Sequence, residues 1–252
     1  MHGCVNLEGD IVIPNNTRTI GSSAFENCRK IKSVAISDRV TSIGEAAFYN
    51  CRELITAKIG DGVNTIADRT FYNCQKMVNI TIGRNVSVIS SSAFRNCGDL
   101  ENLTIPDSVL VIGKSAFEQC VGLENLSVGS GLQFIGEGAF FSCSKLTNLT
   151  FGDNLTTIDD KAFQYCSKLE NITFGSGLKN IGINIFDYCA AMKNIEISSA
   201  NNYYKSMDGA VYSKDGKTLV LCQRAHLPQK ALANLLQKTK NLSFYRIFSK
   251  NT

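Results

Sequence analysis

Histidine is almost absent from this chain, which has only His2 and His226 among its 252 residues. Nucleophilic catalysis by a Ser-His or Cys-His pair needs a histidine held beside the nucleophile. Both histidines lie outside the regular part of the sequence described below. We therefore predict that the chain is not an enzyme and uses no cofactor.

Long apolar runs are also lacking. No stretch approaches the roughly 18–20 apolar residues that a membrane-spanning helix needs, so no membrane span is expected. The start of the chain, from Met1 to Leu7, lacks the basic segment and apolar stretch of a secretion signal. Either the protein stays in the cytoplasm, or the chain is part of a longer protein that is secreted or exported to the cell surface.

Charged residues are sparse, at 19% of the chain against roughly 25% in ordinary soluble domains. Residues 225–252 carry five positive charges and no acidic residue: Lys230, Lys238, Lys240, Arg246 and Lys250. The net charge of +4 minus these five leaves −1 for the rest of the chain. A basic body, which nucleic-acid binding requires, is therefore missing, and no nucleic-acid partner is expected.

A 23-residue repeat runs through most of the sequence. A phenylalanine recurs eight times without a slip in register, with an isoleucine five residues before it and a cysteine three residues after it. The phenylalanines are Phe25, Phe48, Phe71, Phe94, Phe117, Phe140, Phe163 and Phe186. Such a period indicates a stack of identical structural units.

One central unit predicts the local structure. Leu103 and Ile105 alternate with polar residues, which indicates a short strand, and residues 106–108 (Pro-Asp-Ser) indicate a tight turn after it. Residues 115–120 read as a single helical turn, because Ala116, Phe117 and Cys120 would then share one face. Burying about seven side chains cannot offset the entropy of ordering 23 residues, so each unit needs its neighbours in order to fold.

These residues resemble the BspA-like, or treponemal-type, leucine-rich repeats, whose signature L-x-x-L-x-I-P-x-x-V-x-x-I-G-x-x-A-F-x-x-C is most complete between Leu100 and Cys120. The resemblance covers about residues 4–224. It implies a curved solenoid with a parallel sheet on its concave side. It also implies a bacterial surface or secreted protein that takes part in adhesion and binds host or matrix proteins.

We accordingly expect an α/β repeat solenoid: a right-handed leucine-rich-repeat superhelix with a parallel concave β-sheet and short helical or irregular convex segments. Residues 1–197 form the array, with a partial first unit. Residues 198–224 form a β-hairpin cap with Asp215-Gly216 as its two-residue turn. Residues 225–252 form a basic tail with a short amphipathic helix at 228–240. This tail is either a genuine end cap or the product of a truncated, shifted reading frame.

Eight of the ten cysteines occupy one column of the repeat: Cys28, Cys51, Cys74, Cys97, Cys120, Cys143, Cys166 and Cys189. Buried free thiols that act as small apolar groups are the favoured interpretation. Disulfides between neighbouring units are an alternative, although parallel side chains make the required dihedral angle hard to reach. Zinc is disfavoured, because ligands along one line cannot surround a metal, and no metal site is predicted.

Two further patterns suggest chemistry only superficially. Residues 113–115 (Gly-Lys-Ser) resemble the end of a phosphate loop, but the position five residues before them is Ser108 where the motif needs glycine. Asp159 and Asp160 form an acidic pair, but adjacent side chains diverge and no second carboxylate is expected to face them for acid–base work.

The outward side of the predicted strands carries the candidate binding face. Its residues form an asparagine column and a hydroxyl column: Asn79, Thr81, Asn102, Thr104, Asn125, Ser127, Asn148, Thr150, Asn171 and Thr173. One interpretation is a solvated sheet stabilised by ladders of like side chains. The other is a ligand-facing platform that makes weak, multivalent contacts with a protein or a glycan.

The favoured function is a monomeric, non-enzymatic protein-binding or adhesion domain. The alternative is a structural or intracellular scaffold module, or a truncated gene product without activity of its own.

Overall fold

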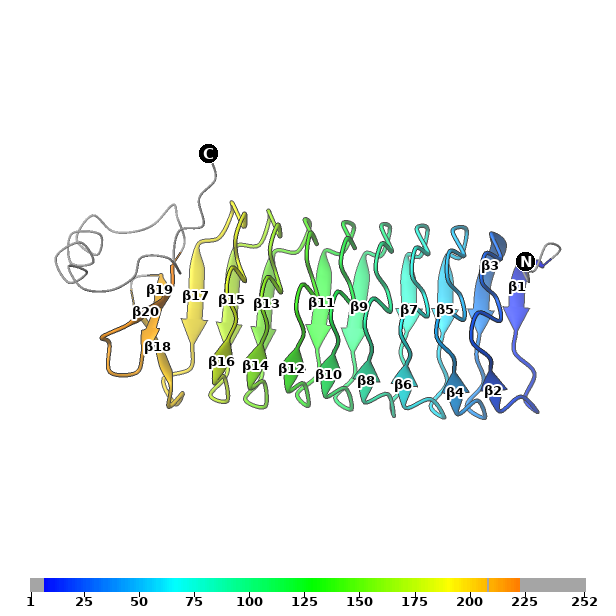
Figure 1. Cartoon of the computed structure of the whole chain (residues 1–252), viewed down its shortest axis with the longest axis horizontal. Helices are drawn as coiled ribbons and strands as arrows, with labels where there is room; N and C mark the ends of the chain where they lie inside the picture. Colours follow the sequence, from blue (N-terminus) through cyan, green and yellow to red (C-terminus); the bar gives the residue numbers. More distant parts are fainter. Residues whose placement is uncertain (1–6, 208, 223–252) are drawn as a thin grey trace.

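The computed structural model describes residues 7–207 and 209–222. The repeat folds into a solenoid of about eight coils, with strands on two faces (Figure 1). The longer strands are β1 (Glu8–Val12), β3 (Lys30–Ala35), β5 (Thr56–Lys58), β7 (Asn79–Thr81), β9 (Asn102–Ile105), β11 (Asn125–Val128), β13 (Asn148–Phe151), β15 (Asn171–Phe174) and β17 (Asn194–Ile197). We call the surface that they form the long-strand face.

A second set of two-residue strands forms the short-strand face, which the sequence pattern did not predict. These strands are β2 (Thr19–Ile20), β4 (Ser42–Ile43), β6 (Thr65–Ile66), β8 (Val88–Ile89), β10 (Val111–Ile112), β12 (Phe134–Ile135), β14 (Thr157–Ile158) and β16 (Asn180–Ile181). On both faces most strands pair in parallel with the strand one unit away, as Ile112 does with Ile89 and Ile135. The pairing is interrupted between β11 and β13 on the long-strand face and between β4 and β6 on the short-strand face. Most coils therefore contact their neighbours through paired strands at two places.

The core is a set of columns of like residues that run along the solenoid. Leu103 and Ile105 point inward from β9, and Ile112 points inward from β10; all three are buried. The phenylalanine rings stack from coil to coil, with centroids 4.9–5.3 Å apart between Phe25 and Phe163. The ring spacing is close to the roughly 4.8 Å between paired strands, so the core columns and both sheets share one repeat distance.

The expected helical turn at residues 115–120 is wrong, because the described part of the chain contains no helix. Ser115 and Gln119 have positive φ angles of 53° and 61°, and a right-handed helix cannot contain them. The N–H groups of Ser115, Phe117 and Gln119 donate to carbonyls of the next coil, at 2.8–2.9 Å. Every second backbone donor is thus used between coils, which leaves only isolated turns in place of helical hydrogen bonding.

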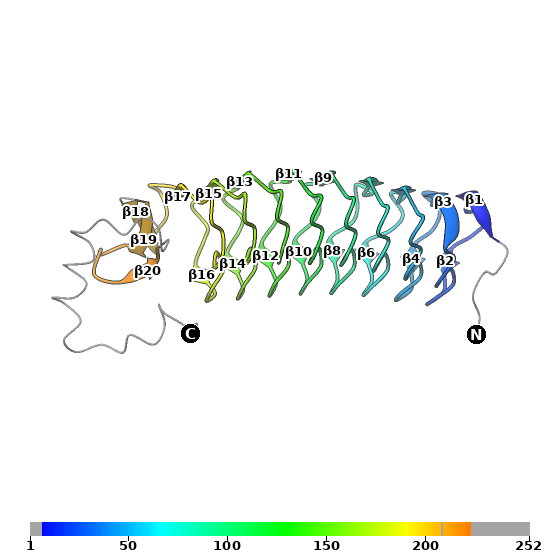
Figure 2. The ribbon, with the colours of Figure 1, turned by 90° about the horizontal axis from the view of Figure 1, so that it is seen from above.

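The expected curvature of the solenoid is at most slight, since the solenoid is nearly straight in two perpendicular views (Figures 1 and 2). A leucine-rich repeat bends when helices on one side need more room than strands on the other. Here the strands and the stacked turns give nearly the same distance between neighbouring coils on every side of the solenoid. The α/β description is therefore corrected to a parallel β-solenoid.

A small antiparallel sheet follows the last coil. It consists of β18 (Tyr204–Met207), β19 (Ala210–Ser213) and β20 (Leu219–Leu221). Gly216, with φ of 75°, lies in the turn between β19 and β20. The buried Asn201 joins this sheet to the solenoid: its Nδ2 donates to the carbonyls of Ser176 and Leu178, and its Oδ1 accepts from the N–H groups of Tyr203 and Tyr204.

The domain boundaries drawn at residues 197 and 224 stay predictions. The basic tail at 225–252, with its expected helix at 228–240, lies outside the described residues, as do His2 and His226.

Candidate functional site

The predicted binding residues all lie on the long-strand face, at the first and third positions of strands β7 to β15. Side chains alternate along a strand, so these positions point outward whenever the second and fourth point into the core. The eight residues from Asn79 to Thr150 are exposed, while Asn171 and Thr173 are half-buried. We call this set the polar face.

Parallel register brings like residues side by side. Asn102 pairs with Asn125, and Thr104 pairs with Ser127. The same holds farther along, where β13 pairs with β15 through Asn148–Asn171 and Thr150–Thr173. The polar face is therefore two parallel rows, one of amides and one of hydroxyls, that run along the solenoid axis.

Part of the amide row forms hydrogen-bonded ladders. Nδ2 of Asn125 donates to Oδ1 of Asn102 at 2.8 Å. Farther along, Nδ2 of Asn171 donates to Asn148 at 2.6 Å, and Asn194 donates to Asn171 at 2.9 Å. An amide has two N–H donors and two acceptor lone pairs, so each ladder residue keeps hydrogen-bonding capacity for a partner. The ladder and the binding platform are therefore compatible interpretations of one surface.

A shallow groove at the start of the polar face was not predicted. It has a volume of about 280 Å³ and is lined by Ser33, Val34, Ala35, Thr56, Ala57, Lys58, Asn79 and Thr81. Ala35 is a short side chain at this groove, where the same position of the next three coils carries Lys58, Thr81 and Thr104. Ala35 stands where the hydroxyl row would have threonine, and this break in the column is the sequence signal that could have revealed the groove.

An ion-pair network lies at the edge where the long strands begin. Glu53 is held between Lys32 and Lys76, with both N–O distances at 2.7 Å. Hydrogen bonds from Lys32 and then from Lys76 lower the pKa of Glu53 to about 2. This carboxylate therefore stays ionised at any ordinary pH and cannot act as a general acid.

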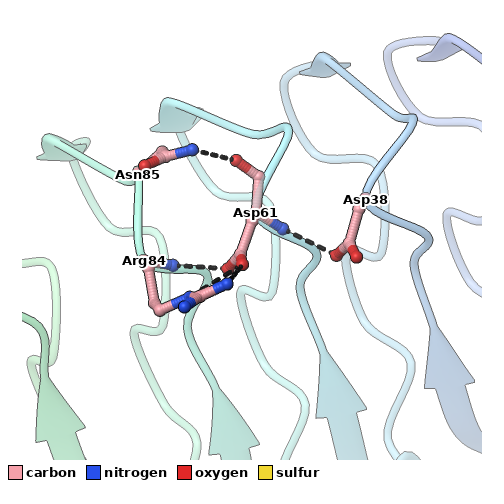
Figure 3. Close-up of polar contacts among 4 residues, drawn as sticks. All are labelled: Asp38, Asp61, Arg84 and Asn85. Carbon is pink, nitrogen blue, oxygen red and sulfur yellow. Dashed lines mark hydrogen bonds and ion pairs between the residues drawn. The ribbon is translucent and has the colours of Figure 1, made fainter.

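Carboxylates at the opposite edge support the turns that follow the long strands (Figure 3). Asp38 accepts the backbone N–H of Asp61 at 3.0 Å, and Asp61 accepts the N–H of Arg84 at 2.8 Å. The Arg84 guanidinium also donates to Asp61, while Asn85 donates to the Asp61 carbonyl (Figure 3). Hydrogen bonds from Arg84 lower the pKa of Asp61. These acids position neighbouring coils and do not form a catalytic pair.

The other acidic pair has a similar structural role. Asp160 Oδ1 accepts the N–H of Ile183 at 2.8 Å, and burial followed by the charge of Asp160 raises the pKa of Asp159. The Gly-Lys-Ser segment at 113–115 carries no free cation, because Lys114 pairs with Glu137 at 2.6 Å.

The cysteine column consists of buried free thiols from Cys51 to Cys189. Each thiol also donates a hydrogen bond to the phenylalanine carbonyl of the preceding coil, as Cys120 does to Phe94 at 3.2 Å. Burial raises the pKa of Cys51, Cys120 and Cys189 to about 12, so these thiols are protonated and poor nucleophiles. Cys28 departs from the prediction of a free thiol, because it is disulfide-bonded.

The described residues also bear on metal binding and on membrane insertion. Within residues 7–207 and 209–222, no group of three His, Cys, Asp or Glu side chains is placed to hold a metal ion. The same part of the chain has no helix of the length and apolar character needed to cross a membrane.

Comparison with sequence families gives a match to the BspA-type leucine-rich repeat region, in six copies that cover residues 2–124 and 111–208. Comparison with curated protein sequences gives no match.

Solved structures of bacterial leucine-rich repeat proteins are similar to this chain. A leucine-rich repeat protein from Bacteroides ovatus is 26% identical over 75% of this chain and 63% of its own, with a TM-score of 0.61. A leucine rich cell surface protein from Faecalibacterium prausnitzii is 26% identical over 84% of this chain and 53% of its own, with a TM-score of 0.60. The T. pallidum leucine-rich repeat protein, at 22% identity, a TM-score of 0.53 and coverage of 73% of this chain and 77% of its own, shares the fold. The chain thus spans about half to two thirds of the first two proteins.

Proposed function

The chain belongs to the BspA-type leucine-rich repeat family, and on that premise we propose that it is a non-enzymatic protein-binding domain of a bacterial cell-surface or secreted protein. The polar face is the surface that receives the partner, a host or matrix protein. The observation that carries this proposal is the pair of amide and hydroxyl rows along the long-strand face, in register between β9 and β11 and between β13 and β15. The name of the related Faecalibacterium protein, which includes the words cell surface, supports the location.

The chemistry of the polar face favours many weak contacts over one tight site. Its two rows contain no aromatic side chain and no arginine from Asn79 to Thr173, and these are the residues that usually dominate tight interfaces. Amide and hydroxyl groups instead each offer a modest hydrogen bond. Because similar groups recur at each coil from β7 to β15, affinity grows with the number of these coils in contact. Extended arrays therefore serve this function better than a single pocket does.

Replacing Asn102, Asn125 and Asn148 together by alanine is expected to weaken binding to an array of purified extracellular-matrix proteins by at least about tenfold, since each lost hydrogen bond is worth roughly 0.5–1.5 kcal/mol. The matched control replaces three residues of the short-strand face, Thr65, Thr157 and Asn180, by alanine. Thermal unfolding of both variants shows whether the stack is intact.

Unchanged binding by the first variant, or equal losses in both variants, would remove the polar face as the binding surface. A chain that binds no matrix protein on the array would contradict the adhesion function and favour the structural scaffold.

A further inference from the structure

A second surface lies along the edge of the solenoid formed by the phenylalanine turns. The residue after each phenylalanine is at least partly accessible there, and the first five form a column that we call the turn-edge column: Glu26, Tyr49, Tyr72, Arg95 and Glu118. A groove of about 620 Å³ runs beside this column across four coils. The rest of its lining consists of Ser22, Ser23, Glu45, Ala46, Arg69 and Ser92. Because these are mostly short side chains, the two tyrosines stand beside open space.

The coil spacing stacks the two tyrosines. The rings of Tyr49 and Tyr72 have centroids 5.0 Å apart and lie within 14° of parallel. The guanidinium of Arg95 covers the outer face of Tyr72 at 5.9 Å, and Glu118 pairs with Arg95 at 2.8 Å. One end of the stack is thus closed by a cation that an aromatic face and a carboxylate hold together.

The other end of the stack has the same aromatic face and a carboxylate, but no cation. Glu26 precedes Tyr49 in the column, and no ring other than Tyr72 is stacked on Tyr49 in the described part of the chain. Among the same residues, Glu26 accepts one hydrogen bond, from Nδ2 of Asn27 at 3.3 Å, and forms no ion pair. The neighbouring Glu45, by contrast, is paired with Arg69 at 3.1 Å.

The side chains of the turn-edge column are, in order, a carboxylate, two aromatic rings, a cation and a second carboxylate. The column therefore has a cation next to Tyr72 but none next to Tyr49. We propose that the turn-edge groove binds an arginine side chain of a partner protein, with its guanidinium over the open side of Tyr49 and beside the carboxylate of Glu26. The guest cation contacts the same two kinds of group, an aromatic face and a carboxylate, that hold Arg95 within the chain. This site is separate from the polar face and does not depend on it.

The partly buried position of Arg95 carries a cost in stability. Nε of Arg95 is buried and has no hydrogen-bond partner among the described residues, and an unsatisfied buried donor is unfavourable. A shorter apolar side chain at this position would avoid that cost. Arginine suits the guest position because its planar guanidinium stacks on rings and pairs with carboxylates in a forked geometry, which lysine cannot do.

The test uses a fluorescent peptide, Ser-Gly-Arg-Gly-Ser, and the same peptide with citrulline, a neutral group of nearly equal shape. Anisotropy titration with the full chain measures the dissociation constant. Glu26→Gln and Tyr49→Leu are each expected to weaken binding of the arginine peptide by about 3- to 10-fold. Tyr49→Phe keeps the aromatic face and is expected to bind as the parent does. The citrulline peptide is expected not to bind.

Glu124→Gln is the matched control, because it removes an exposed carboxylate away from the groove. An equal loss from Glu124→Gln and Glu26→Gln would reveal non-specific attraction and overturn the proposal. Binding of the citrulline peptide at the same affinity, or no loss in Tyr49→Leu, would overturn it as well. Glu26→Gln leaves the ring stack intact, so its result stands even if Tyr49→Leu fails to fold.

Discussion

Replacing Phe117 by alanine is expected to lower the free energy of unfolding by about 3–5 kcal/mol. Phe117 is fully buried and lies between Phe94 and Phe140, with ring centroids 5.1 and 5.3 Å away. Removal of this ring leaves a cavity in the middle of a column whose members cannot shift, because the backbone of each coil is hydrogen-bonded to both neighbours. Urea unfolding followed by circular dichroism measures the loss.

Phe25→Ala is the matched control at the end of the column. Phe25 is only partly buried and stacks on one neighbour, Phe48, at 4.9 Å. Its replacement is expected to cost about half as much or less, since fewer contacts are lost and the site is open to water. Equal costs for Phe25 and Phe117 would contradict the view that each coil is stabilised by the coils on both sides.

Raising the pH above 9 is expected to unfold the protein steeply. The thiols of the cysteine column have an ordinary pKa of 9.0, which burial raises to about 12 in Cys51, Cys120 and Cys189 and well above 9.0 in Cys74, Cys97, Cys143 and Cys166. Between pH 9 and 12 the unfolded chain releases these protons while the folded chain keeps them. Their contribution to stability is therefore fully present below pH 9 and is lost as the pH rises toward 12.

Each thiol lowers the free energy of unfolding by up to about 1.4 kcal/mol per pH unit in this range. Seven thiols acting together would remove the usual 5–15 kcal/mol of stability within one to two pH units. The measurement is a series of urea unfolding curves between pH 8 and 10.5.

The variant with Cys97, Cys120 and Cys143 replaced by alanine separates the thiols from other alkaline groups. Its free energy of unfolding is expected to fall less steeply with pH, by about 4 kcal/mol per pH unit. A slope equal to that of the parent chain would show that tyrosine or lysine titration causes the alkaline unfolding. The comparison of slopes holds even though the triple variant starts from a lower stability.

Strand positions and facing could be predicted from the sequence because a strand has a period of two. Leu103 and Ile105 are buried in the structure, while Asn102 and Thr104 between them are exposed. One unit sufficed for this inference, and the 23-residue period then placed every other coil in register. The polar face was predicted on the same physical basis.

The turn at residues 115–120 could not be predicted in this way. Ala116, Phe117 and Cys120 share an inward side in a helical turn and also in the observed chain of tight turns, so the apolar pattern does not distinguish the two. Positive φ normally favours glycine, but in the column of residues that contains Ser115 the only glycine is Gly138. The other positions of this column have positive φ with residues such as Arg69 and Ser115. The conformation is held by hydrogen bonds to the next coil, which exist only after the coils stack.

The turn-edge groove escaped prediction for a different reason. A search for repeats finds the positions that stay constant, whereas this groove lies where a column changes from Glu26 to Tyr49 and from Tyr72 to Arg95. Short strands such as β10 were missed because two residues cannot show alternation. The groove depends on different residues at the same position of successive coils, and the short strands depend on pairing between coils. Neither feature can be inferred from the sequence of a single unit.

Amide hydrogen exchange measured by NMR tests the stacked-coil account most directly. The N–H groups of Ser115 and Phe117 donate to the next coil within the middle of the solenoid, while those of Ser23 and Phe25 make the same bonds in the first coil. The account predicts exchange slower by orders of magnitude at the two central residues, because they open only when several coils separate. Exchange at Phe117 as fast as at an exposed loop residue such as Asp107 would contradict it.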